Sequence, residues 1–197
     1  MSKAEKTKEF IIEKAAPVFN IKGYAGTSIT DLMLATGLTK GSIYGNFENK
    51  DEVAIAVYNY HVNRLNNQIN DFLLPKKSMI DKLIGITDYY RNNWKSICER
   101  GGCPILNTSV EADDNMPALK KLVQQSINNW ALTIARVIEK GMERGEIKPT
   151  VVAIDYGYTI ISMLEGGIML TKIMNSHKHI HAALDRILAM INTELKK

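Results

Sequence analysis

The stretch from Thr27 to Lys50, TSITDLMLATGLTKGSIYGNFENK, constrains the fold most strongly, because it predicts two short helices separated by a tight turn. Ser28 is a residue type that caps the start of a helix, and Gly37 suits the turn between the two helices. Leu38 is expected to fill the turn from inside, and Thr39 to open the second helix.

This second helix is expected to run from Lys40 to Phe47, with one apolar and one polar face. Ile43 and Phe47 lie four residues apart, so both point inward. The outward side carries small, polar and basic residues: Lys40, Gly41, Ser42, Tyr44, Gly45 and Asn46. Two crossed helices with a glycine between them, the second short and outwardly polar, are typical of the helix-turn-helix motif that enters the major groove of DNA.

The same stretch resembles a known family. The pattern TS-I-x-D-L, followed by T-G-L-TKGS-I-Y-x-x-F and x-K-x-E-V, is similar to the N-terminal domain of TetR-family transcriptional regulators from about Phe10 to Val57. It departs from the usual pattern at Met33, Leu34 and Thr36, where alanines and a polar residue are more common. The resemblance implies an all-α fold, in which an N-terminal three-helix DNA-binding domain precedes a larger helical domain for effector binding and dimerisation.

The composition limits the classes of protein to which this chain can belong. With 197 residues and 45% hydrophobic content the chain can bury a core, and no apolar run reaches the length of a membrane span. The N-terminus is charged and unlike a signal peptide, and two cysteines fit a reducing compartment, so we expect a cytoplasmic protein without a membrane partner. The net charge of +4 is weak evidence for nucleic acid, since no arginine occurs before Arg64.

Helical periodicity runs through the whole chain and predicts no strand. The expected helices beyond the motif span residues 3–22, 50–74, 78–99, 104–112, 117–144, 151–175 and 177–195. We expect a DNA-binding domain over residues 1–50, with its motif at about 28–47, and an effector-binding and dimerisation domain over residues 51–197. The helix over 151–175 is apolar nearly all round and must be covered on both sides.

A dimer of this kind predicts a double-stranded operator with an inverted repeat, because the two second helices would lie about one turn of duplex, roughly 34–36 Å, or a small multiple apart. Lys40 is the expected base contact, since lysine can donate to guanine O6 and N7. The other expected contacts approach the DNA closely or hold its backbone: Thr27, Ser28, Thr30, Thr39, Gly41, Ser42, Tyr44, Asn46 and Lys50.

The family resemblance also implies an effector pocket among the middle helices. The candidate wall residues are mostly aromatic or contain sulfur: His61, Tyr89, Tyr90, Trp94, Cys103, Met116, Trp130, Tyr158 and Met163. Such a wall suits a small apolar or aromatic effector, and ordinary core packing is the alternative for each residue. Glu165 is a lone charge in an apolar helix and needs a partner: the effector, a donor from a second subunit or solvent.

The last two helices together predict half of a four-helix homodimer interface. Its expected residues combine two glycines that permit close helix approach with a heptad-like apolar stripe: Gly166, Gly167, Leu184, Ile187, Leu188 and Ile191.

The cysteines and histidines raise two further hypotheses, a reactive thiol and a metal site. Cys103 precedes Pro104 at an expected helix start and lies near Arg100, features that favour a reactive thiolate able to sense electrophiles or oxidants. A small core residue is the alternative. His177 and His181 share a helix face, but no cysteine or carboxylate cluster accompanies them, so we expect no metal and no cofactor.

These observations favour a DNA-binding transcriptional regulator that a small molecule releases from its operator. A thiol-based sensor within the same family is the first alternative. A helical adaptor, or an enzyme without DNA binding, is the alternative of a different class. No nucleophile–base pair or phosphate-binding loop supports the enzyme.

Overall fold

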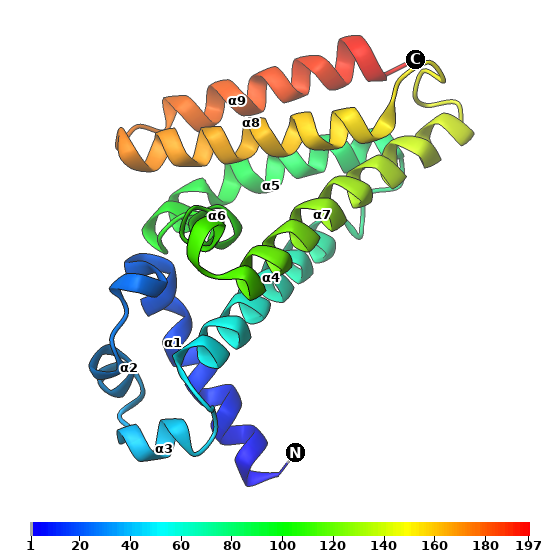
Figure 1. Ribbon diagram of the computed structural model, residues 1–197. Helices are drawn as coiled ribbons and strands as arrows, with labels where there is room; N and C mark the ends of the chain where they lie inside the picture. The colour runs from blue at the N-terminus through cyan, green and yellow to red at the C-terminus, as the bar shows by residue number, and fades with distance from the viewer. Residues whose placement is uncertain (1) are drawn as a thin grey trace. The chain divides into compact units, whose positions relative to one another are not determined.

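The structure is a computed structural model that describes residues 2–197, apart from the side chains of residues 113–115. The prediction of an all-α chain is confirmed in this described part (Figure 1). The elements are α1 (Lys3–Gly26), α2 (Ile29–Thr36), α3 (Lys40–Tyr44), α4 (Lys50–Leu73), α5 (Met79–Glu99), α6 (Pro104–Asn115), α7 (Pro117–Glu143), α8 (Ala153–Ile173), α9 (Lys178–Met190) and a π-helical turn, η1 (Ile191–Leu195).

The chain divides into two compact units, and the division differs from the expected boundary at residue 50. The first, here the head unit, runs to Leu65 and also includes Pro104–Val123. The second, here the body unit, comprises Asn66–Cys103 and Gln124–Lys197. Helix α6 joins the head unit because it packs against α1, a contact that sequence periodicity does not reveal.

In the head unit, α1 supplies the apolar face on which the other elements pack. Its residues Ile11 and Ala15 are fully buried and Phe19 is nearly so. The helix continues through Pro17, and its regular backbone ends at Gly23, whose φ of 73° interrupts the helical conformation three residues before Gly26. Helix α4 begins as expected at Lys50.

In the body unit, α8 packs along α9, and both contact α5 (Figure 1). Close helix approach depends on glycine here. A Cβ atom on Gly157 would lie 2.6 Å from the carbonyl oxygen of Ala131 in α7, and one on Gly167 would lie 3.0 Å from the Cβ atom of Ala183 in α9. None of the described helices is both long enough and apolar enough to cross a membrane.

Candidate DNA-binding site and ligand sites

The start of α2 is fixed by a reciprocal cap. The Ser28 hydroxyl accepts a hydrogen bond from the Asp31 backbone N–H at 3.1 Å, and the Asp31 carboxylate accepts from the Ser28 N–H at 2.9 Å. Lys22 adds a salt bridge to Asp31 at 2.6 Å. The hydrogen bond from Lys22, followed by those from Ser28, holds the pKa of Asp31 well below its usual range. The carboxylate therefore stays charged and keeps the cap closed at physiological pH.

The turn between α2 and α3 has the predicted chemistry. Gly37 adopts the left-handed conformation with φ of 69°, which L side chains rarely adopt. Leu32, Ile43 and Phe47 are buried beneath the motif. Helix α3 ends at Tyr44, three residues earlier than expected, and Phe47 remains an apolar anchor beyond its end.

The leading end of α3 is exposed and carries the expected base-reading candidates. Thr39 caps the helix by accepting from the Ser42 N–H at 3.2 Å. The side chain of Lys40 is exposed, with its ammonium 6.0 Å from the centre of the Tyr44 ring. A Cβ atom on Gly41 would meet nothing within 4 Å, so this position leaves open space at the helix surface.

The side chains of four other expected DNA contacts differ in their exposure to solvent. Ser42, Tyr44 and Asn46 are half-buried, and the Asn46 amide donates to the Ser42 carbonyl at 2.9 Å. Thr30 is exposed at the first turn of α2. They therefore stay candidates for contacts to phosphate, with Asn46 held in place by α3 itself.

Two expected DNA contacts have structural partners instead. Thr27 is 1% exposed, and its hydroxyl donates to the Gly23 carbonyl at 2.6 Å. The Lys50 ammonium donates to the carbonyls of Tyr24 and Thr27 at 2.8 and 2.9 Å and lies 4.1 Å from the centre of the Tyr24 ring. Both side chains thus hold the segment between α1 and α2 rather than present a donor to DNA.

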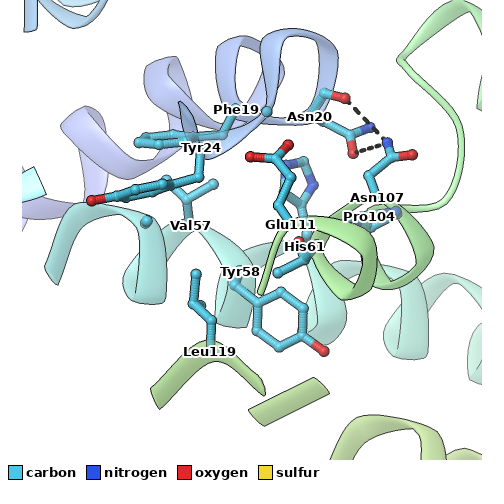
Figure 2. Close-up of a pocket in the computed structure, with 13 residues that line it drawn as sticks. Phe19, Asn20, Tyr24, Val57, Tyr58, His61, Pro104, Asn107, Glu111 and Leu119 are labelled. Carbon is cyan, nitrogen blue, oxygen red and sulfur yellow. Dashed lines mark hydrogen bonds between the residues drawn. The ribbon is translucent and has the colours of Figure 1, made fainter. Parts of the chain in front are cut away.

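A cavity lies within the head unit, between α1, α4, α6 and the start of α7 (Figure 2). Its empty space is 440 Å³, including space open to solvent. Phe19 and Tyr24 stack at one side, with ring centres 6.4 Å apart. Burial, followed by the hydrogen bond to Asp51, raises the pKa of Tyr24 to about 12, so this phenol remains neutral. His61 is the one expected effector contact that lines this cavity.

The nine expected effector residues do not fall in one unit. His61 and Met116 belong to the head unit and the other seven to the body unit. Tyr89 and Tyr90 are buried core residues in edge-to-face contact at 5.3 Å. Trp94, Trp130 and Met163 are half-buried, and Tyr158 is exposed, with its hydroxyl donating to Asn128 at 2.9 Å.

Glu165 lies in a buried polar cluster of the body unit with Tyr90 and Cys103. Neither carboxylate oxygen accepts a well-formed hydrogen bond from the described residues, and the Tyr90 hydroxyl is likewise buried without such a bond. Burial raises the pKa of Glu165 to about 7, and the nearby Cys103 thiol opposes that rise. Cys103 is 3% exposed and lies beside a carboxylate, a setting that disfavours a thiolate and access by an electrophile.

The histidines form an aromatic cluster at the start of α9. The ring of Trp94 lies 5.6 Å from that of His177 and 6.3 Å from that of His181. Among the described residues, no group of three or more histidine, cysteine or acidic side chains is placed to hold a metal ion.

The expected dimer residues are mostly covered within the chain itself. Leu184, Ile187 and Ile191 are at most 1% exposed, and Gly167 packs against α9. These four positions therefore fill the core of one subunit, which corrects their assignment to the interface. Leu188 is half-buried, and Gly166 faces open space on α8.

One structural contact had no signal in the sequence analysis. Glu111 of α6 accepts the Ala25 N–H at 3.0 Å, although the two residues are 86 positions apart. A Cβ atom on Gly23 would lie 1.8 Å from the Glu111 carboxylate, so glycine is needed there for space as well as for its positive φ.

Comparison with known proteins agrees with this architecture. Residues 11–57 match the family described as bacterial regulatory proteins, tetR family, and residues 80–187 match the tetracyclin repressor-like C-terminal domain. Among curated relatives, the HTH-type transcriptional repressor DhaR of Mycobacterium sp. (strain GP1) is 23% identical over 184 residues, which cover 93% of this chain and 89% of DhaR.

Solved structures extend the match over the whole chain. A TetR-family transcriptional regulator from Cytophaga hutchinsonii is 36% identical, with a TM-score of 0.95, and the match covers 100% of this chain and 98% of that one. A TetR transcriptional regulator from Chloroflexus aurantiacus is also 36% identical, with a TM-score of 0.91 and coverage of 100% and 99%. The resemblance inferred from Thr27–Lys50 is thereby confirmed, and the family consists of regulators rather than enzymes. The chain belongs to the TetR family of DNA-binding transcriptional regulators.

Proposed function

We propose that this regulator is a cytoplasmic repressor that binds an inverted-repeat operator as a homodimer and releases it when a small molecule binds. The exposed leading end of α3 is the observation that carries this proposal. There the Lys40 ammonium and the open surface at Gly41 stand on a helix whose cap and buried face are fixed. Such an end can enter the major groove and read base edges.

The exposed side of α8 supports the homodimer. Tyr158, Met169 and Ile173 are 42%, 46% and 75% exposed, and with Gly166 they follow helical spacing along one face. Apolar side chains aligned in this way mark an interaction surface. This face takes the place of the buried residues first expected at the interface.

Release requires that the ligand bind one state of the dimer more tightly than the other, because equal affinity for both states shifts no equilibrium. The state favoured by the ligand would hold the two α3 helices at a separation that does not fit the operator.

Operator binding is tested by fluorescence anisotropy with a duplex from the region upstream of the protein's own gene and a scrambled duplex. Lys40→Ala should weaken operator binding by about 1–3 kcal/mol and reduce the preference for operator over scrambled DNA. Lys178→Ala, which removes an exposed lysine at the start of α9, is the matched control and should leave both affinities unchanged. Equal weakening on both duplexes by Lys40→Ala would make Lys40 a phosphate contact. Failure of the wild-type protein to prefer the upstream duplex would count against the proposed operator.

A further inference from the structure

The cavity of the head unit has walls that suit a small ring compound. The stacked rings of Phe19 and Tyr24 lie on one side and the buried ring of Tyr58 on another (Figure 2). These aromatic faces suit a planar or apolar group.

The cavity also carries a negative charge. Glu111 alone has a formal charge among its described lining residues, and its carboxylate projects between the stacked rings and His61 (Figure 2). Neighbouring polar groups already have partners: His61 Nε2 is 2.9 Å from the Ala16 carbonyl, and the Asn107 amide donates to the Asn20 side chain at 3.0 Å. A carboxylate beside aromatic faces favours a cation over a neutral or anionic compound.

We propose that this cavity binds a small organic cation, a protonated amine attached to a single ring, with its ammonium at Glu111 and its ring against Tyr24 and Tyr58. The site lies entirely within the head unit. It would give the proposed repressor its effector class, and the regulatory part of the inference rests on that proposed function.

Glu111 links this site to the DNA-binding motif. Its Oε2 atom accepts the Ala25 N–H at 3.0 Å, in the last turn of α1. Three residues later, Ser28 caps α2. A ligand ammonium that draws the Glu111 carboxylate towards the cavity competes with the Ala25 N–H, and so loosens the segment that leads into the motif. By reciprocity, bound operator must weaken ligand binding by the same factor.

The binding step is tested by isothermal titration calorimetry without DNA, using three matched probes: 2-phenylethylammonium, neutral 2-phenylethanol and anionic 3-phenylpropanoate. Glu111→Gln is the main variant, because its amide oxygen can still accept the Ala25 N–H while the charge is lost. Glu165→Gln removes a carboxylate from the body unit in the same isosteric way and is the control.

Wild-type protein and Glu165→Gln should bind the ammonium probe in the millimolar range or better. Glu111→Gln should bind it at least about tenfold more weakly, and wild-type protein should bind the other two probes more weakly than the ammonium. The proposal is overturned by equal binding of all three probes, by unchanged binding to Glu111→Gln, by loss of binding in Glu165→Gln alone, or by no binding to the wild-type protein.

The regulatory step is tested by anisotropy with the upstream duplex. The ammonium probe should lower the operator affinity of the wild-type protein and leave that of Glu111→Gln unchanged. Ammonium binding without any effect on a measurable operator affinity would overturn the link through Ala25. Absence of operator binding would instead refute the proposed function, while the calorimetric result would still decide the cation site.

Discussion

The buried carboxylate of Glu165 should make the protein less stable as the pH rises. Burial raises its pKa from the ordinary 4.5 to about 7, and the opposing hydrogen bond from Cys103 offsets only part of this rise. The perturbation that isolates this effect is Glu165→Gln, because glutamine has nearly the same shape as the protonated acid and cannot ionise.

The direction in which stability changes with pH follows from how many protons the folded and unfolded chains bind. Below pH 4.5 the folded and unfolded chains both hold the proton, so the carboxylate costs nothing. Between pH 4.5 and about 7 the unfolded chain loses its proton first, and the free energy of unfolding falls with each step in pH. Above about pH 7 the folded chain bears the whole cost of burying the ionised Glu165 carboxylate. A rise of the pKa from 4.5 to about 7 corresponds to about 3 kcal/mol.

Urea unfolding measured by circular dichroism from pH 5 to pH 9, at one fixed protein concentration, tests this directly. Glu165→Gln should exceed the unfolding free energy of the wild type by less than about 1 kcal/mol at pH 5 and by up to about 3 kcal/mol at pH 9. The exposed Glu143→Gln is the control and should follow the wild type throughout. A wild-type to Glu165→Gln difference that does not change with pH would refute the assignment of the cost to ionisation.

Three other predictions concern the head unit. Gly23→Ala and Gly37→Ala both place alanine at positive φ, which costs about 1 kcal/mol, but only Gly23→Ala also drives a Cβ atom into Glu111. Thermal unfolding should therefore show a larger loss for Gly23→Ala, and addition of Glu111→Ala should remove the excess; equal losses would contradict the contact. Lys50→Met should lower the unfolding free energy by about 1.5–3 kcal/mol, because two carbonyls lose a charged donor. If operator affinity fell in this variant while stability was unchanged, Lys50 would be a phosphate contact after all. Residues 1–50 contain no arginine, and three of their seven lysines, Lys8, Lys22 and Lys50, already have protein partners, so few cations remain for phosphate. The slope of log K against log salt should therefore be shallower than about −10, and an equally steep slope would show that more phosphates are neutralised.

Local pattern was enough to locate the helices. The long helix expected over residues 50–74 is α4, Lys50–Leu73, because its apolar positions recur at helical spacing and Pro75 ends it. Helix α3 is shorter than expected because the chain leaves the helix at Gly45, while Phe47 still reaches the core. Apolar periodicity reports which side chains are buried but cannot show whether the backbone beneath them is still helical.

Partners distant in sequence could not be predicted in this way. Lys50 looks like a phosphate contact by position, but its stem is long enough to reach carbonyls 23 and 26 residues earlier. Glu111 occurs in an unremarkable polar stretch, and only the packing of α6 against α1 brings it to Gly23. The roles of Lys50 and Glu111 depend on where the folded chain directs their side chains, and residue type alone does not reveal this.

The boundary between the two units has a practical consequence for dissecting the protein. The chain passes from one unit to the other three times: inside α4, between Leu65 and Asn66; at the start of α6, between Cys103 and Pro104; and inside α7, between Val123 and Gln124. Proteases cut mainly at exposed, flexible loops. Two of the crossings lie inside helices, and the turn before the third, residues 101–103, is buried, so limited digestion has no exposed loop at any of them. A fragment ending at residue 65 would also lack α6, and with it the acceptor for the Ala25 N–H. Isolated motif fragments should therefore be poor substitutes for the full-length chain in DNA-binding experiments.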